Sequence, residues 1–217
     1  MLRLALLPQR ERPLRLLCLG AHPDDIEIGC GGTVLRLVNE VPDLEVRWIV
    51  FSGEDGRQAE ASDSAATFLN NVCGNRVDLL RFRDGYFPFQ GADIKDYFEA
   101  LKKEYAPSLI LTHWKGDAHQ DHRLIGELTH DTFRNHLVLE YEIPKYDDDL
   151  GNPTFFVPLT RLQLDSKVEA IGRHFVSQRR RSWFSDDTFR AMARLRGIGC
   201  NAPEGFAEAF YVSRIVF

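Results

Sequence analysis

Three ionisable side chains stand together near the start of the chain, in the segment His22-Pro-Asp24-Asp25. Imidazole and carboxylate groups both bind metal ions, and the proline fixes the torsion angle φ of the backbone between them. His22 and Asp25 are close enough to share one cation, which leaves Asp24 free to transfer a proton. The alternative is a polar turn in which Asp25 stands near the start of a helix, where carboxylates are common.

A second group of similar residues occurs far along the chain. His113, His119 and His122 fall within ten residues, and Asp121 stands just before the last of them. A solitary histidine is usually a core or surface residue, whereas two loops that both carry His and Asp and meet in the fold are rarely a coincidence. The function therefore depends on whether the chain brings the two groups together.

Each group directly follows a segment with the pattern of a buried strand. The apolar run 16–19 ends shortly before His22, and the run 107–112 ends just before His113. In α/β proteins the carboxyl ends of parallel strands lie at one edge of the sheet, where binding sites form. We therefore expect the two groups to converge on a single site.

The whole chain has the pattern of an α/β fold, a mostly parallel sheet with helices on both faces. The predicted strands are 16–19, 44–51, 76–82, 107–112, 137–143 and 208–217. The predicted helices are 33 onward, 59–71, 92–105, 122–136, 160–173 and 185–196. Gly29, Gly31 and Gly32 are expected in the turn ahead of the first helix, whose apolar pattern starts at Thr33.

Length and composition limit the classes of protein to which the chain can belong. With 217 residues and 44% apolar composition it can bury the core of one large domain. The net charge of −5 gives no basic field for nucleic acid, and no apolar run reaches membrane-spanning length. Four scattered cysteines indicate a reducing, cytoplasmic setting. We expect one domain, 1–217, with an N-terminal arm (1–13), a core (14–135) and a C-terminal part (136–217) that carries a substrate loop, helices and a final strand.

Convergence of the two groups would give a catalytic metal site. Three residues would supply ligands and leave one coordination position for water, as in catalytic zinc sites: His22, Asp25 and His122. Bound zinc lowers the pKa of its water to about 7. Asp24 is placed to take the proton of that water, and His119 could stabilise the oxyanion or protonate the leaving nitrogen. Asp121 could then orient His119.

The segments 21–25 and 119–122 together resemble the paired motifs of the PIG-L/LmbE family of zinc-dependent N-deacetylases. The resemblance covers about 14–135 and implies a Rossmann-like core with the metal site at the carboxyl edge of the sheet. That family acts mainly on N-acetylglucosamine units. The resemblance therefore implies hydrolysis of the N-acyl group, mainly N-acetyl, of an amino sugar or its conjugate.

The same resemblance implies a role for each motif residue. The metal ligands would be His22, Asp25 and His122. Asp24 would be the general base, and His119, with Asp121 beside it, would assist the oxyanion or the leaving group. Zinc and ferrous iron both suit His and Asp ligands, so the ion could be Zn²⁺ or Fe²⁺.

Two other functions are compatible with these residues. A protein of the same fold could bind a sugar or nucleotide with a structural metal or none. The presence of both Asp24 and His119 argues against that function, since a structural metal needs neither. Alternatively, the enzyme could hydrolyse another amide or a thiol conjugate.

Four further residues are predicted to contact the substrate, since they follow strands that end beside the site: Arg57, Tyr86, Glu142 and Tyr146. An amino sugar offers hydroxyls to Glu142 and an apolar ring face to a tyrosine. The arginine run 179–181, with Trp183 close behind, could bind a sugar phosphate. A basic surface turn is the preferred interpretation of that run.

Overall fold

The chain folds around a mostly parallel sheet, as predicted. The computed structural model describes residues 13–215, so the expected arm at 1–13 lies outside the described residues except for Pro13. The strand order is β3-β2-β1-β4-β5-β7-β6, and β7 runs antiparallel to both of its neighbours. The strands are β1 (Leu14–Gly20), β2 (Leu44–Ser52), β3 (Gly74–Phe82), β4 (Leu109–His113), β5 (Leu137–Tyr141), β6 (Phe155–Leu159) and β7 (Phe206–Tyr211).

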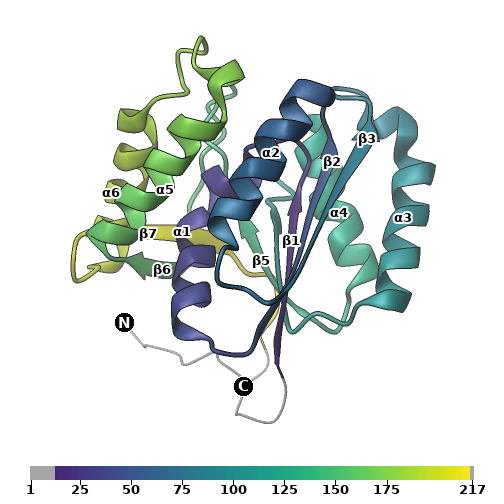
Figure 1. Cartoon of the computed structure of the whole chain (residues 1–217), viewed down its shortest axis with the longest axis horizontal. Coiled ribbons are helices and arrows are strands. Elements are labelled where there is room, and N and C mark those ends of the chain that lie inside the picture. The colour runs from purple at the N-terminus through teal and green to yellow at the C-terminus, as the bar shows by residue number, and fades with distance from the viewer. Residues whose placement is uncertain (1–12, 216–217) are drawn as a thin grey trace.

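Helices cover both faces of this sheet (Figure 1). They are α1 (Asp25–Glu40), α2 (Asp55–Phe68), α3 (Gly91–Glu104), α4 (Gln120–Thr132), α5 (Arg161–His174) and α6 (Asp186–Cys200), with the short 3₁₀ helices η1 (Phe87–Gln90) and η2 (Val176–Gln178). One apolar cluster holds α1, α2, α5 and α6 against the sheet, and a second holds α3 and α4. Side chains of β1 alternate between the clusters, because successive residues of a strand point to opposite faces. Across residues 13–215, no helix combines the length and apolarity needed to cross a membrane.

The start of α1 differs from the prediction. The helix begins at Asp25 rather than Thr33, so the glycines expected in a turn are helical residues. They are small because α1 packs closely on its surroundings: a Cβ on Gly29 would lie 2.2 Å from the ring of Tyr141, and one on Gly32 would lie 2.5 Å from a leucine of β6. Packing therefore overrides the low helix propensity of glycine.

Other element bounds also differ from the predictions. β6 was not predicted, and its Pro158 explains why: proline lacks the N–H that a central strand needs but is tolerated at the edge of a sheet, where β6 lies. The final strand, predicted at 208–217, is β7 and ends at Tyr211, while residues 216 and 217 lie outside the described residues. α2 and α4 each begin before the predicted residue, at Asp55 and Gln120.

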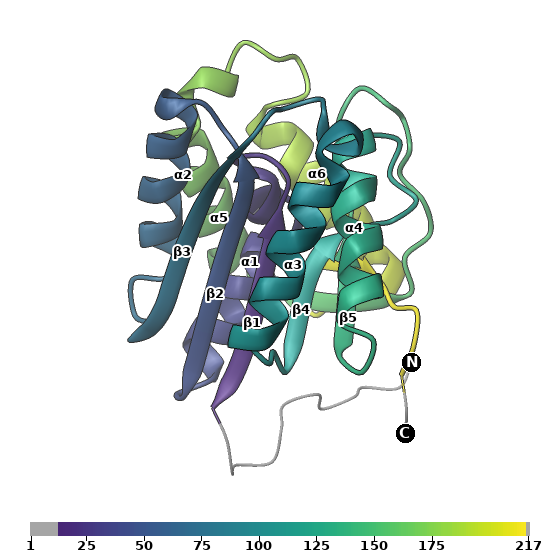
Figure 2. The same ribbon diagram turned by 90° about the vertical axis from the view of Figure 1, so that its right-hand side faces the viewer.

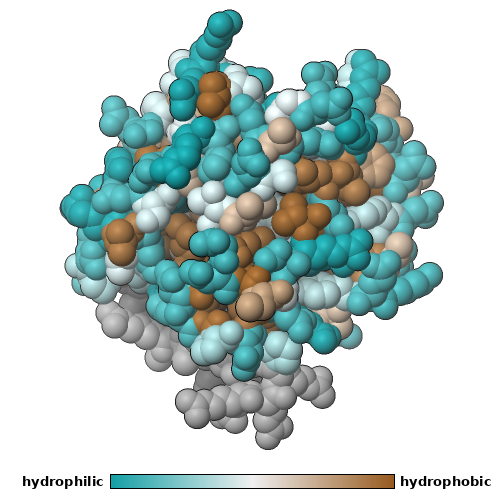
Figure 3. Space-filling model, in the orientation of Figure 1, coloured by the Kyte–Doolittle hydropathy of each residue, from teal (hydrophilic) through white to brown (hydrophobic). Residues whose placement is uncertain are grey.

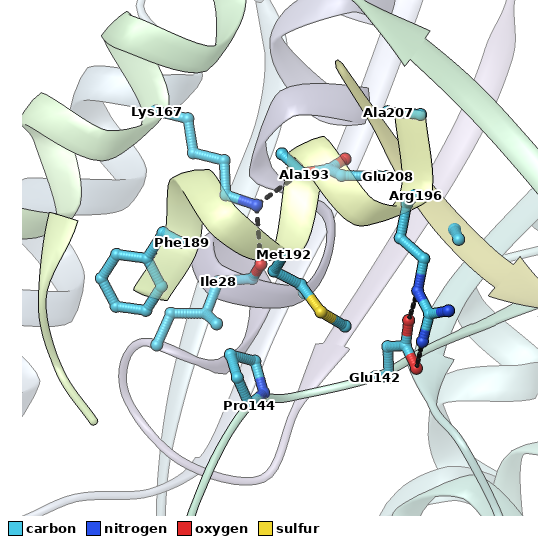
Figure 4. A pocket seen from close by; sticks show the side chains of 12 residues that line it. Ile28, Glu142, Pro144, Lys167, Phe189, Met192, Ala193, Arg196, Ala207 and Glu208 are labelled. Carbon is cyan, nitrogen blue, oxygen red and sulfur yellow. Dashed lines mark hydrogen bonds and ion pairs between the residues drawn. The ribbon is translucent and has the colours of Figure 1, made fainter. Parts of the chain in front are cut away.

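A buried ion pair joins α1 to the C-terminal elements (Figure 4). Lys167 Nζ on α5 lies 2.7 Å from Glu208 Oε1 on β7 and donates to the carbonyl of Ile28 at 2.7 Å. Glu208 also accepts from the amides of Gly32 (2.8 Å) and Thr33 (2.6 Å). Ile28 and Gly32 are four residues apart, the spacing of one hydrogen-bonded helical turn. The ion pair thus lies against the backbone of α1 within its first half.

We expect Lys167→Met to lower the free energy of unfolding by about 3 kcal/mol, because it leaves the Glu208 carboxylate buried without its cation. Urea denaturation followed by circular dichroism measures the loss. The matched control is Arg173→Met, which breaks an exposed ion pair with Glu169 on the same helix and should change stability by less than about 0.5 kcal/mol. Equal losses in the two variants would show that the buried pair adds no special stability.

Candidate active site

The structure brings the two predicted groups together at the carboxyl edge of the sheet. His22 follows β1, Asp25 opens α1 and His122 lies in the first turn of α4. His22 Nδ1 lies 3.1 Å from His122 Nε2 and 3.4 Å from Asp25 Oδ2, and His122 Nε2 lies 3.5 Å from Asp25 Oδ1. All three side chains are buried. Two ring nitrogens and a carboxylate therefore converge on one point.

A tight turn places the first group. The amide of His22 donates to Asp25 Oδ2 at 2.6 Å, and the amide of Asp25 donates to the carbonyl of His22 at 3.3 Å. Between them Asp24 has a φ of 100°, a left-handed conformation that few residues other than glycine adopt. The turn holds Asp25 against His22. The carboxylate of Asp24 instead approaches Arg57, whose Nη2 lies 3.2 Å away.

The donor set fits a divalent cation. His122 Nδ1 lies 3.0 Å from Asp117 Oδ2, a contact that places the ring proton on Nδ1 and leaves the Nε2 lone pair facing His22 and Asp25. Burial lowers the pKa of His122 to about 3, so this imidazole is neutral near pH 7. A buried neutral imidazole whose lone pair faces other donor atoms is the form in which histidine binds metal ions.

Carboxylates also surround the second imidazole. His22 Nε2 lies 3.1 Å from Asp84 Oδ1 and 3.2 Å from Asp121 Oδ2. Burial alone would lower the pKa of His22, but its contacts with Asp121, Asp25 and Asp84 raise that pKa well above the ordinary value. Positive charge is therefore favoured around the ring of His22, either as a proton on that ring or as a bound cation.

Three overlapping sets of donor atoms in residues 13–215 are close enough together to hold a cation: His22, His119 and His122; Asp25, His113 and His122; and His22, Asp84 and Asp121. The predicted ligands His22, Asp25 and His122 do not form one of these sets but are divided between the first two, which share His122. His113 Nε2 lies 2.9 Å from the amide of Ala21, which donates to it. This bond occupies the lone pair that a cation would need. His113 therefore fits a supporting role beneath Asp25, whose Oδ2 is 3.1 Å away.

The environment of Asp24 suits a proton acceptor. Its side chain is buried, and burial raises the pKa of the carboxyl to about 7, while the nearby Arg57 opposes this rise. Arg57 also donates to the carbonyl of Pro23. The structure thus places Arg57, predicted as a substrate contact, against the predicted base.

His119 and Asp121 lie beside the converging donors. The ring of His119 meets that of His22 edge-on, with centroids 4.9 Å apart. Its Nδ1 accepts from the backbone amide of Asp121 at 3.3 Å, whereas the carboxylate of Asp121 accepts from the amides of Gly85 (2.7 Å) and Phe87 (3.1 Å). Asp121 thus touches His119 through its backbone, and its side chain holds the loop that follows β3.

The other predicted substrate contacts lie in different surroundings. Tyr86 is 42% exposed, in the loop that Asp121 holds, and Tyr146 is 65% exposed. Glu142 is buried and forms two hydrogen bonds with Arg196, at 2.6 and 2.8 Å (Figure 4). The carboxylate of Glu142 therefore has a protein partner, and its contact with a sugar hydroxyl stays a prediction.

Three residues of the site were not assigned roles from the sequence: Asp84, His113 and Asp117. Each had a signal in the sequence. Asp84 stands two residues after the end of β3, as His22 stands two residues after the end of β1. His113 and Asp117 lie inside the second group itself, but their hydrogen bonds to Ala21 and His122 depend on the folded geometry.

Comparison with known proteins gives a family. The model of the family described as "PIG-L: GlcNAc-PI de-N-acetylase" matches residues 17–133, the part of the chain that carries both groups. A protein of Escherichia coli (strain K12) named "Uncharacterized deacetylase YaiS" is 31% identical over 152 residues, which are 64% of this chain and 80% of that protein.

Solved structures share the fold. The N,N'-diacetylchitobiose deacetylase of Pyrococcus horikoshii superposes with a TM-score of 0.65 at 20% identity, over 92% of this chain and 83% of that one. GalB, the 4-carboxy-2-hydroxymuconate hydratase of Pseudomonas putida KT2440, superposes with a TM-score of 0.72 at 17% identity, over 94% and 98%. Since proteins named as a deacetylase and a hydratase share it, the fold alone does not determine the reaction.

Proposed function

Because this chain belongs to the PIG-L family of de-N-acetylases, we propose that it is a metal-dependent hydrolase that removes the N-acetyl group from an amino sugar or its conjugate. The observation that carries the proposal is the convergence of His22, Asp25 and His122, with the buried carboxyl of Asp24 next to Asp25 in the same turn. We further propose Zn²⁺ as the ion, with Fe²⁺ as the alternative, since the ligand set suits both.

The metal would be held by His22, Asp25 and His122, and when bound it supplies Lewis acidity, which activates water and polarises the acetyl carbonyl. Asp24 accepts the proton of the attacking water. Arg57 favours the ionised carboxylate that this step needs.

His119 serves the developing oxyanion. Burial and the nearby His22 lower the pKa of His119, which favours the neutral ring. Since Nδ1 accepts from the amide of Asp121, the single ring proton lies on Nε2. Nε2 of His119 has no hydrogen-bond partner among residues 13–215. It is therefore available to donate to the substrate oxygen or the leaving nitrogen.

Arg57→Met should move the acid limb of the pH profile of kcat/KM upward by about one pH unit. Arg57 lowers the pKa of Asp24, so its removal raises that pKa, and the base is then ionised only at higher pH. Activity should be lost mainly on the acidic side and largely recovered in more alkaline buffer. Arg57→Lys keeps the charge and should keep most of the profile. An unshifted acid limb in Arg57→Met would mean that Arg57 does not act through Asp24.

The function is tested by metal analysis followed by assays of acetate release. Protein purified anaerobically is loaded with Zn²⁺ or Fe²⁺ and given N-acetylglucosamine, its conjugates and an N-acetylated amino acid. Release of acetate from the sugars alone supports the proposal. Release from the amino acid alone would make the protein a hydrolase of another amide, and one metal ion per chain without hydrolysis would favour a binding protein.

A further inference from the structure

The segment 175–185, here called the basic loop, is hydrogen-bonded near its start to α2. The amide and hydroxyl of Ser177 donate to the carboxylate of Glu60 at 2.8 and 2.6 Å. Glu60 lies three residues after Arg57 on α2, about one helical turn away. Since Arg57 contacts the base Asp24, this side of the basic loop stands close to the proposed site.

The other end of the basic loop contacts Tyr146, which is connected to the His122 side of the site. Ser182 Oγ donates to the hydroxyl of Tyr146 at 3.4 Å, and the ring of Trp183 meets that of Tyr146 edge-on, with centroids 6.5 Å apart. Tyr146 follows Lys145, whose Nζ lies 3.0 Å from Asp117 Oδ1, and Asp117 in turn contacts His122. The basic loop therefore runs from the side of the base to the side of the metal ligand, above the carboxyl ends of the strands (Figure 2).

The three arginines of the basic loop differ in their partners. Arg179 donates to the carbonyl of Gly172 at 3.1 and 2.6 Å, which holds the loop on the end of α5. Arg180 and Arg181 are exposed, and neither has a side-chain hydrogen bond or ion pair with residues 13–215. The basic loop forms the tip at the top of the view in Figure 3, and the surface of this tip is mostly hydrophilic. Two guanidinium groups thus remain available to a ligand.

Resting on the proposed function, we propose that Arg180 and Arg181 bind an anionic group of the substrate, a phosphoryl or carboxylate group that the amino sugar carries in addition to the acetamide. Guanidinium groups match both anions in geometry. Trp183 and Tyr146 add aromatic surface for the sugar ring. The chain as a whole carries a net charge of −5, so its overall field does not attract an anion, and local positive charge such as that of Arg180 and Arg181 has to do so.

The test compares three substrates of the zinc-loaded enzyme: methyl N-acetylglucosaminide, which is neutral, N-acetylglucosamine 1-phosphate and N-acetylmuramic acid. The parent enzyme should prefer an anionic sugar in kcat/KM. The double variant R180A/R181A should lose about tenfold on the preferred anion through KM, with little change on the neutral sugar. Comparison of kcat/KM for N-acetylglucosamine 1-phosphate and N-acetylmuramic acid shows whether the arginines prefer a phosphate or a carboxylate. Arg134→Ala, which removes an exposed charge at the far end of α4, should change nothing.

An anion preference that survives in R180A/R181A overturns the proposal, as does equal turnover of neutral and anionic sugars by the parent. If no sugar is hydrolysed, the proposed function fails, and direct binding decides the role of the basic loop. Calorimetric titration of Asp24→Asn with N-acetylglucosamine 1-phosphate should then show binding that R180A/R181A abolishes. Binding unaffected by the two substitutions would refute the assignment.

Discussion

Asp24→Asn is expected to keep the metal content of the parent protein and to lower kcat by about 100- to 10,000-fold. The amide has the shape of the carboxylate but cannot accept the proton of the attacking water. Asp24 is absent from the three sets of donors that could hold a cation, and its carboxylate faces Arg57, so metal binding should be unaffected. Metal analysis and steady-state assays on the same preparation measure both quantities.

A matched control for this substitution is Asp84→Asn, which removes a largely exposed carboxylate close to His22. This variant tests whether the loss of any negative charge at the site slows turnover. We expect it to lower kcat far less than Asp24→Asn does. If Asp24→Asn turned over substrate at nearly the parental rate, the base would have to be reassigned.

Replacement of any one of His22, Asp25 and His122 by Ala should reduce metal affinity by more than about 100-fold. Removal of a group that merely orients a ligand lowers metal affinity by about 10- to 100-fold, so removal of a ligand itself should lower the affinity further. Plasma mass spectrometry of dialysed protein gives the metal content per chain. Circular dichroism checks that each variant is folded.

Two further variants separate the overlapping donor sets. His119→Ala and Asp84→Asn should keep the parental metal content if the ligands are His22, Asp25 and His122. Loss of metal from Asp84→Asn together with retention by His122→Ala would instead select the set of His22, Asp84 and Asp121.

The core strands and the meeting of the two groups could be predicted because their signals are local. Strands buried on both faces are continuous apolar runs, as 16–19 and 109–111 are, and the topology of a parallel sheet brings the ends of β1 and β4 together. The chemistry of the site follows from short segments directly after those ends. Neither inference requires knowledge of distant contacts.

The features that could not be predicted depend on distant partners. Gly29 lies in a helix that packs too closely on the ring of Tyr141 to leave room for a Cβ, and β6 includes Pro158 because it pairs with β7 at the edge of the sheet. The hydrogen bond between Glu142 and Arg196, 54 residues later, was not predicted either. Such partners leave no periodic or spacing signal near the residue they affect.

The ion pair of Lys167 and Glu208 has a consequence for biosynthesis. A ribosome makes the chain from its amino end, so both loops of the site are complete long before residue 208 is added. Until then, the amides of Gly32 and Thr33 lack the carboxylate that receives them in the folded protein. The helix that opens with Asp25 can therefore reach its final packing only after residue 208 has been translated, although the residues of both loops are present much earlier.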